Sequence, residues 1–300
     1  TNSYASCTPA LEAGRVYIHF GAYGTACLDA KTAETIWERR DFVCDDFRGP
    51  GSSPILFENL LIVNFDGYDF DFVVALNKET GETVWKTDRN CEFGTLDGDM
   101  RKAYGTCTVI EHGGRTQLLS TAAKYTFSYD PRSGAELWRA EVGGMNSGSR
   151  PIYAHGLVYV STGDGGDGLA VIRPDGVGDV TKTHLAWKTK QVISKRPSPL
   201  IVDDLLFVLS DEGVASTRDA ATGDNIWKQR LPGKYWASPV FADGRVYLFS
   251  QDGDGVVMKL GKECTTIAEN KLDKGCNASP AVVGDTLFVR TFSHLYRIDP

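Results

Sequence analysis

ALNKETGETVW, residues 75–85, recurs along this chain and decides its fold. An apolar strand end leads into a turn with Thr80 and Gly81, and a second strand ends at Trp85. Three close copies are LDAKTAETIW (28–37), YDPRSGAELW (129–138) and RDAATGDNIW (218–227). In all four an Asp or Asn stands eight positions before the tryptophan. The repeated unit is therefore a hairpin.

Each part of this hairpin has a physical role. The Asp or Asn side chain at the strand end can accept hydrogen bonds from the amides of the turn. The turn glycine supplies the positive φ that a tight turn or bulge requires. The first copy has Ala33 in place of that glycine, so we expect its turn to be looser or strained.

A second shared element, a short strand with a small hydroxyl residue and usually a proline, precedes each hairpin. Anchored on Pro9, Pro54, Val109, Pro151, Pro199, Pro239 and Pro280, these elements are 45, 55, 42, 48, 40 and 41 residues apart. Runs rich in β-branched and aromatic residues follow them, such as LLIVNF (60–65). A unit of this length with four short strands and no helical periodicity matches one β-propeller blade.

The sequence thus predicts an all-β protein, a single propeller domain over residues 1–300 with seven repeats of four-stranded antiparallel blades. A blade cannot bury its faces alone, so we expect the recurring tryptophans to pack between blades rather than to act in catalysis. They are Trp37, Trp85, Trp138, Trp187 and Trp227. The fourth repeat replaces the tight turn with a longer excursion, IRPDGVGDVTKTHLAW (172–187), and the sixth has no tryptophan.

The ends of the chain bear on the number of blades. The last repeat stops at HLYRIDP (294–300), after a third strand, and the first begins at its inner strand. We expect seven blades of an eight-bladed whole whose N-terminal part is absent here. A plain seven-bladed ring is the alternative.

The L-D-A-x-T-G-x-x-x-W pattern resembles the pyrroloquinoline quinone (PQQ) repeat. Quinoprotein alcohol dehydrogenases carry this repeat, as do non-catalytic relatives such as the bacterial outer-membrane assembly lipoprotein. FRGPGSSPILFENLLIVNFDG (47–67) and FVVALNKETGETVWKTDRN (72–90) are similar to a PQQ-like propeller family of planctomycetes and related bacteria. The resemblance covers essentially the whole chain. It implies a propeller exported to the periplasm or cell envelope.

Charge and composition exclude several partners. The net charge of −7 and a pI near 5.3 give no electrostatic attraction to nucleic acid or to an anionic membrane surface. No apolar run of 18 residues predicts a transmembrane segment. The seven cysteines show no C-x-x-C spacing and no cluster with histidine, so no zinc site is predicted. They are Cys7, Cys27, Cys44, Cys91, Cys107, Cys264 and Cys276.

The longest connections between blades mark the candidate binding face. Trp37 to Pro54 spans 17 residues and Trp85 to Val109 spans 24, whereas the connections after the next three tryptophans span 13, 12 and 12. Loops that do not pack in the core commonly carry binding or catalytic residues. The candidate residues of this face are Asp45, Asp46, Arg48, Asp97, Asp99, Arg101, Lys102, Arg150, Lys195, Arg196 and Tyr235, with Asp66, Asp164 and Asp252 as possible additions from the turns between second and third strands. The alternative is that these charges are solvated and paired with one another.

Two further features of the loops stay open. Cys44 and Cys91 lie in adjacent long loops and either form a disulfide in an exported protein or remain thiols. The turns DGGDG (164–168), DGDG (252–255) and DGD (97–99) suggest calcium, but none has the EF-hand layout. Asp-Gly is also the preferred dipeptide of tight hairpin turns, so no metal ligand is assigned.

The two functional hypotheses are a scaffold and an enzyme. Catalytic members of the resembling family carry adjacent cysteines that form a disulfide beside PQQ, together with a catalytic Asp and calcium. Here no Cys-Cys pair occurs and no residue matches that Asp. G-x-S-x-G and H-E-x-x-H are also absent. We therefore predict a non-catalytic binding protein without a cofactor, with a protein or polysaccharide partner; the alternative is a PQQ-dependent dehydrogenase.

Overall fold

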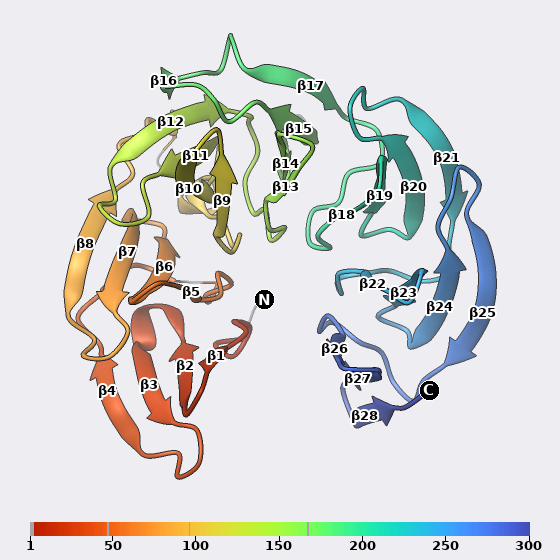
Figure 1. Ribbon diagram of the computed structural model, residues 1–300, viewed down its shortest axis with the longest axis horizontal. Helices are drawn as coiled ribbons and strands as arrows, with labels where there is room; N and C mark the ends of the chain where they lie inside the picture. Colours follow the sequence, from red (N-terminus) through yellow and green to blue (C-terminus); the bar gives the residue numbers. More distant parts are fainter. Residues whose placement is uncertain (1–2, 47, 96, 167) are drawn as a thin grey trace. The chain divides into compact units, whose positions relative to one another are not determined.

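The computed structural model describes residues 3–46, 48–95, 97–166 and 168–300. These residues form β-strands in seven sheets of the propeller-blade type, with two short 3-10 helices (Figure 1). Apart from β16, which pairs in parallel with β12, the strands of each sheet lie in sequence order, and adjacent strands such as β1 and β2 run antiparallel. The prediction of an all-β propeller with seven repeats is confirmed, and the last sheet has three strands, as HLYRIDP indicated.

The chain divides into two compact units, Thr1–Ala186 and Trp187–Pro300, which we describe separately. A single domain over residues 1–300 stays a prediction. Among the described residues, no helix combines the length and the apolar character needed to cross a membrane.

The first three sheets lie in the first unit. The first sheet has β1 (Ala10–Glu12), β2 (Arg15–His19), β3 (Thr25–Asp29) and β4 (Thr35–Arg39), with the 3-10 helix η1 (Gly21–Tyr23). The second has β5 (Ile55–Phe57), β6 (Leu60–Asp66), β7 (Asp71–Asn77) and β8 (Thr83–Asp88), followed by η2 (Gly98–Arg101). The third has β9 (Thr108–His112), β10 (Arg115–Thr121), β11 (Tyr125–Tyr129), β12 (Glu136–Glu141) and the added β16 (Gly178–Asp179).

The fourth sheet has β13 (Ile152–Ala154), β14 (Leu157–Ser161), β15 (Leu169–Ile172) and β17 (Leu185–Thr189). The remaining sheets lie in the second unit. The fifth has β18 (Leu200–Val202), β19 (Leu205–Leu209), β20 (Val214–Asp219) and β21 (Asn225–Arg230). The sixth has β22 (Val240–Ala242), β23 (Arg245–Phe249), β24 (Asp254–Lys259) and β25 (Thr265–Lys271), and the seventh has β26 (Ala281–Val283), β27 (Thr286–Arg290) and β28 (Leu295–Ile298).

Strand β6 shows why the blades must stack. Its sequence LLIVNFD is buried along its whole length, because both faces of this sheet are covered. Leu61, Val63 and Phe65 pack with Tyr17 and Trp37 of the first sheet. Leu60 and Ile62, which point the other way, pack with residues of the third sheet. The apolar cores therefore lie between sheets, as expected for repeats that bury each other.

The recurring Asp or Asn acts as the sequence predicts. In each copy its side-chain oxygen accepts hydrogen bonds from the amides two and three residues later, at 2.8 to 3.3 Å. The four residues are Asp29, Asn77, Asp130 and Asp219. Ala33 has φ +59°, and its amide donates to the carbonyl of Asp29 at 2.9 Å, as the glycines of the other copies do. This turn is strained rather than looser.

The turn glycines have a second role that the sequence did not reveal. Gly134 lies against the ring of Trp85, and a Cβ placed on it would be 2.5 Å from a ring carbon. Gly81 lies against Trp37 and Gly223 against Trp187 in the same manner. These three tryptophans, Trp37, Trp85 and Trp187, therefore pack on the turn of a neighbouring hairpin. Trp37 and Trp85 also donate from Nε1 to a backbone carbonyl of that hairpin, at 3.0 Å.

We expect Gly134→Ala to lower the free energy of unfolding by about 2–4 kcal/mol, because it adds both strain at positive φ and a clash with Trp85. Ala33→Gly is the matched control. It relieves the strain at φ +59° and should stabilise the protein by about 0.5–1 kcal/mol. Urea unfolding of both variants measures the two effects. A neutral Gly134→Ala substitution would contradict the packing role.

The long segment that replaces the tight turn in the fourth repeat, within residues 172–187, pairs with the third sheet. Strand β16 pairs in parallel with β12, and the amide of Val180 donates to the carbonyl of Arg139 at 2.9 Å. Val180 is buried beside Trp138. Arg115 and Gln117 donate to the carbonyl of Pro174 at 2.8 and 2.9 Å. Segment 173–184 is thus a strap across the outer edge of the third sheet.

Candidate functional site

The two long connections meet in the first unit, beside the turn between β6 and β7. The amide of Asp45 donates to Asp69 Oδ1 at 2.7 Å, and the amide of Tyr68 donates to the carbonyl of Asp45 at 3.0 Å. Arg101 of η2 donates from Nη2 to the carbonyl of Asp69 at 3.0 Å. We call the described residues of this surface the loop platform: 41–46, 48–53, 66–71, 88–95 and 97–104.

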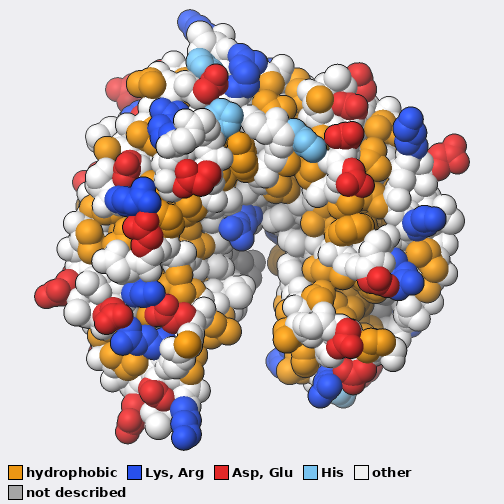
Figure 2. All heavy atoms as spheres, viewed as in Figure 1, with side chains coloured by type: hydrophobic (Ala, Val, Ile, Leu, Met, Phe, Trp, Pro, Cys, Tyr) orange, Lys and Arg blue, Asp and Glu red, His pale blue; other side chains and the backbone are white. Residues whose placement is uncertain are grey.

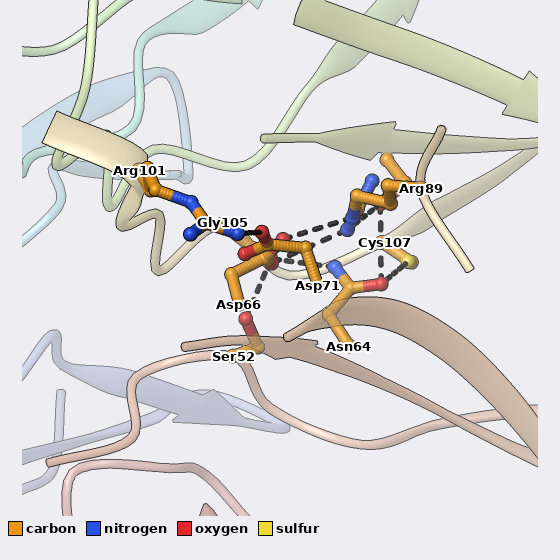
Figure 3. A network of polar contacts seen from close by, with 9 residues as sticks. Ser52, Asn64, Asp66, Asp71, Arg89, Arg101, Gly105 and Cys107 are labelled. Atoms are coloured by element: carbon orange, nitrogen blue, oxygen red, sulfur yellow. Dashed lines mark hydrogen bonds and ion pairs between the residues drawn. The ribbon is translucent and has the colours of Figure 1, made fainter. Parts of the chain in front are cut away.

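A buried ion pair anchors the platform to the blades (Figure 3). Asp66, at the end of β6, and Arg89, just after β8, have side chains that are 1% and 0% exposed, with Nε and Oδ1 2.8 Å apart. Arg89 also donates from Nη2 to Ser120 Oγ of β10 at 2.8 Å. Although burial opposes it, Asp66 raises the pKa of Arg89, so the guanidinium stays charged. The pair joins the second and third sheets.

Asn64 extends this network from the middle of β6. Its Nδ2 donates to the carbonyl of Gly105 at 3.0 Å, and its Oδ1 accepts from Ser120 Oγ at 3.1 Å and from Cys107 Sγ at 3.0 Å (Figure 3). Ser52 Oγ donates to the same Gly105 carbonyl at 3.0 Å. These bonds join β6 to the segments on both sides of the second long loop, from Ser52 to Cys107 and Ser120. The network therefore fixes how the second long loop leaves the blade.

A second buried pair lies between the two loops. Lys102 Nζ and Asp46 Oδ1 are 2.6 Å apart, and the lysine side chain is 1% exposed. Asp46 Oδ2 accepts from the amide of Ala22 in η1 at 2.8 Å. Lysine is rarely buried without a partner, so this pair holds the two loops and η1 together. Both carboxylate oxygens of Asp46 are therefore engaged within the protein, which leaves this side chain little capacity to bind a ligand.

A small cavity separates the two buried pairs. Its lining includes His19, Asp46, Asn64, Asp66 and Lys102, and its volume of about 10 Å³ accommodates roughly one water molecule. Burial lowers the pKa of His19 to about 4, against the opposing effect of Asp46. His19 is therefore neutral at pH 7, with Nδ1 2.8 Å from Thr25 Oγ1. The cavity can hold an ordered water but is too small for an organic substrate.

Two carboxylates face each other at the end of the β6–β7 hairpin. Asp66 and Asp71 are directly paired across the strands. Asp71 Oδ2 accepts from Arg101 Nη2 at 3.3 Å, while its buried Oδ1 has no hydrogen-bond partner in the described residues. Burial, with the repulsion of Asp66, raises the pKa of Asp71 to about 7. Only one of the two carboxylates is therefore reliably charged at neutral pH.

This raised pKa predicts a specific pH dependence. Between the usual Asp value near pH 4 and about pH 7, folded Asp71 holds a proton that the unfolded chain releases, so stability falls as the pH rises through this window. Asp71→Asn should flatten that fall and raise stability at pH 8 on the order of 1–3 kcal/mol. Urea unfolding of both proteins at pH values from 4 to 8 measures this dependence of stability on pH. Asp45→Asn is the exposed control, and an equal flattening there would contradict the assignment.

The candidate residues of the first unit are mostly paired. Arg48 Nε and Asp99 Oδ1 form an ion pair at 2.6 Å, and Asp97 caps η2 by accepting from the amide of Asp99 at 3.0 Å. Arg150 donates from Nε to Thr108 Oγ1 at 2.8 Å. Asp45 is exposed. Lys102 lies in the interior rather than on the surface, because Asp46 holds it there.

The candidates of the second unit form a separate group. Arg196 pairs with Asp211, which also accepts from the amides of Lys195 and Arg196 at 3.0 and 3.3 Å. Tyr235 is fully buried in the core between the fifth and sixth sheets, so it presents no surface. Its amide donates to the carbonyl of Asp211 at 2.9 Å. The binding face therefore has to be considered within the first unit alone.

The additional turn aspartates and the cysteines are not arranged as ligands. Among the described residues, no three His, Cys, Asp or Glu side chains are grouped as a metal site. Asp167 of DGGDG lies outside the described residues. All seven cysteines are free, and Cys44 and Cys91 pack in cores on opposite faces of the second sheet, which rules out their pairing. Burial raises the pKa of Cys91 to about 11, as expected of an unreactive thiol.

Sequence reasoning missed Asn64, Asp71 and Arg89 and placed Asp66 on the surface. A signal was present in LLIVNFD, where two polar residues interrupt an otherwise apolar strand. A buried polar residue must find a partner. The partner, Arg89, follows the last strand of the same blade, and the sequence spacing gave no reason to pair it with Asp66. Asp164 pairs through its backbone with Met145, and Asp252 lies in the second unit.

Comparison with known proteins places this geometry in a family. A family model described as "Outer membrane protein assembly factor BamB" matches residues 2–175, 69–202 and 176–264, most of the chain. The chain belongs to the BamB family. BamB of Marinobacter adhaerens is 23% identical over 111 residues, which are 37% of this chain and 28% of that protein. The resemblance to PQQ-like repeats is thereby confirmed, while a planctomycete relationship stays a prediction.

Solved structures agree on the fold of this BamB-family chain. BamB from Moraxella catarrhalis has a TM-score of 0.73 at 15% identity, covering 95% of this chain and 81% of that one. Quinohemoprotein alcohol dehydrogenase from Comamonas testosteroni has a TM-score of 0.69 at 12% identity, covering 95% and 63%. The dehydrogenase from Pseudomonas putida HK5 has 0.67 at 12%, covering 97% and 64%. The chain thus spans less than two thirds of each dehydrogenase, and these likenesses show the fold alone.

The residues of the described cluster do not fit the cofactor of those dehydrogenases. The cavity between the buried pairs holds about one water molecule, far less than a fused-ring quinone needs. Its cations are already paired with carboxylates of the protein. The cysteines are single free thiols rather than an adjacent oxidised pair. No reaction step is therefore derived through PQQ at this cluster.

Proposed function

We propose that this chain is a non-catalytic, exported propeller of the cell envelope that binds a protein partner through the loop platform. Membership of the BamB family supports a role in protein assembly, because its description names an outer membrane protein assembly factor. The observation that carries the proposal is the platform itself. Two long loops are fixed by buried ion pairs, yet they expose large apolar side chains to solvent.

Three of these exposed side chains come from three different segments of the platform. Val43 is 68% exposed, Phe70 61% and Met100 47%. Two of them flank a contact between the loops, because Phe70 follows Asp69 and Met100 precedes Arg101, which donates to the carbonyl of Asp69. Apolar side chains held in the open on a rigid support are typical of protein interaction sites.

Site-specific cross-linking tests the protein-binding function. A photoreactive amino acid replaces Phe70 in the full chain, which is exposed to envelope extract from the source cells. We expect one discrete protein adduct, which is identified by mass spectrometry. The same replacement at Val177, which is even more exposed but lies on the strap, is the control and should give none. Equal adducts at both positions, or none at Phe70, would refute the proposal, and protection of Phe70 by oligosaccharide alone would favour a polysaccharide.

A PQQ-dependent dehydrogenase remains the second candidate, because two solved structures of that class share the fold. We propose that this chain binds neither PQQ nor calcium. A ligand that binds only the folded state raises the melting temperature with concentration. We expect no such rise with PQQ and calcium together. A concentration-dependent rise would replace the scaffold proposal with the dehydrogenase.

A further inference from the structure

The loop platform has more carboxylates than cations. Each of its four cations is already in an ion pair with a carboxylate. The pairs are Arg48–Asp99, Arg89–Asp66, Arg101–Asp71 and Lys102–Asp46. Two further carboxylates, those of Asp41 and Asp88, pair with cations outside the platform. The cations of the platform are therefore all engaged within the protein.

Four carboxylates of the platform have no ion-pair partner among the described residues. They are Asp45, Asp69, Glu92 and Asp97. All four are exposed. Asp69 and Asp97 accept hydrogen bonds from backbone amides, which orient them without neutralising their charge. The solvent-facing charge of the platform is therefore negative.

Apolar side chains alternate with these carboxylates. Val43 lies two residues before Asp45, Phe70 follows Asp69, and Met100 lies three residues after Asp97. Tyr23 of η1 extends the apolar surface, since its ring stacks edge-on with Tyr4 at 4.4 Å and the neighbouring Ala22 is bonded to Asp46. Both tyrosines are more than half exposed. Acidic and apolar groups are thus interleaved.

The platform is also rigid. The ring of Tyr68 packs so closely on Gly98 that a Cβ there would be 2.3 Å from it, and Tyr104 packs on Gly51 at 2.7 Å in the same sense. Tyr68 Oη donates to Asp99 Oδ1 at 3.1 Å. Because the loops are already ordered, binding does not have to order them.

We infer that the partner segment that binds the loop platform is cationic and apolar, with lysine or arginine interleaved with large aliphatic or aromatic side chains. This inference rests on the proposed function. The unpaired carboxylates attract cations and repel acidic segments, while the exposed side chains gain from apolar burial. On the face seen in Figure 2, side chains of both charges are interspersed.

Labelled synthetic peptides of equal length test the partner chemistry with the intact chain. Leucine alternates with lysine, with glutamate or with serine in three of them, and serine alternates with lysine in a fourth. We expect the Leu–Lys peptide to bind most tightly in fluorescence anisotropy, with an affinity that falls as salt rises. Equal or tighter binding of any other peptide, or no binding of the Leu–Lys peptide, would overturn the inference.

Variants localise the binding. Asp45→Asn combined with Glu92→Gln removes two carboxylates that form no hydrogen bond or ion pair with the described residues, and should weaken binding of the Leu–Lys peptide by about 3–10-fold. Phe70→Ser should weaken it about 10-fold by removing an apolar anchor. Glu111→Gln, an exposed carboxyl on β9, is the matched control and should have no effect. Unchanged affinity in both platform variants would overturn the inference.

The two proposals can fail separately. A protein adduct at Phe70 without selectivity for the Leu–Lys peptide would refute only the cationic partner and leave the protein-binding function in place. No adduct at Phe70 would refute the protein-binding function, and the inference that rests on it would fall with it.

Discussion

Replacing Arg89 by methionine should lower the free energy of unfolding by about 3–5 kcal/mol, because the carboxyl of Asp66, whose pKa burial already raises, would be left in the interior without its partner. The substitution keeps an apolar chain of similar length, so little packing volume is lost. Ser120 Oγ would also lose its charged donor. Urea denaturation at pH 7 measures the change.

The double variant Arg89→Met with Asp66→Leu decides whether the charge or the shape is responsible. Removing both charges should recover most of the lost stability, since a buried ion pair can be replaced by apolar groups of similar volume. Arg132→Met, which breaks an exposed pair with Glu58, should shift the unfolding midpoint little. If the double variant were as unstable as the single one, the assignment of the loss to an unpaired charge would be wrong.

Trp138→Ala should cost about 3–5 kcal/mol, because this is the largest fully buried side chain and its removal leaves a cavity between the third and fourth sheets. Its Nε1 donates to Gln117 Oε1 at 2.7 Å, which also accepts from Ser128 Oγ at 2.9 Å. Both effects should appear as a lower midpoint in urea.

Trp138→Phe separates the two contributions. Most of the apolar volume remains, and only the indole donor and part of the ring are lost, so we expect a cost of about 1–2 kcal/mol. Equal costs for the alanine and phenylalanine variants would mean that the hydrogen bond to Gln117, rather than the buried volume, dominates. That result would contradict a packing role for the tryptophan.

The fold could be predicted because its signals are local and repeated. Asn77, Gly81 and Trp85 act within one hairpin or against its neighbour, so their spacing in the sequence already contains the geometry. The three-stranded last sheet likewise follows from where the β-rich runs end. One such turn is weak evidence for a fold, but its recurrence along the chain is strong evidence for a repeat architecture.

The loops were predicted less well because their geometry depends on distant partners. Asp46 finds Lys102 across 56 positions, and whether such a residue faces solvent or the interior depends on that encounter. Membership of a loop therefore did not predict exposure for Lys102 or Tyr235. The short strand β16 had no local signature either, because two residues pair with a strand of the preceding repeat.

The strap that contains β16 changes which parts of the protein unfold together when a sheet opens locally. In the other sheets of the described residues, each strand pairs only with strands of its own repeat, and side chains form the cores between sheets. In the fourth repeat, by contrast, the amide of Val180 donates a hydrogen bond to the carbonyl of Arg139 in the preceding blade. Its hydrogen exchange should therefore report the opening of the third sheet, although the residue belongs to the fourth repeat. The boundaries of cooperative opening in this protein do not coincide with the boundaries of its sequence repeats.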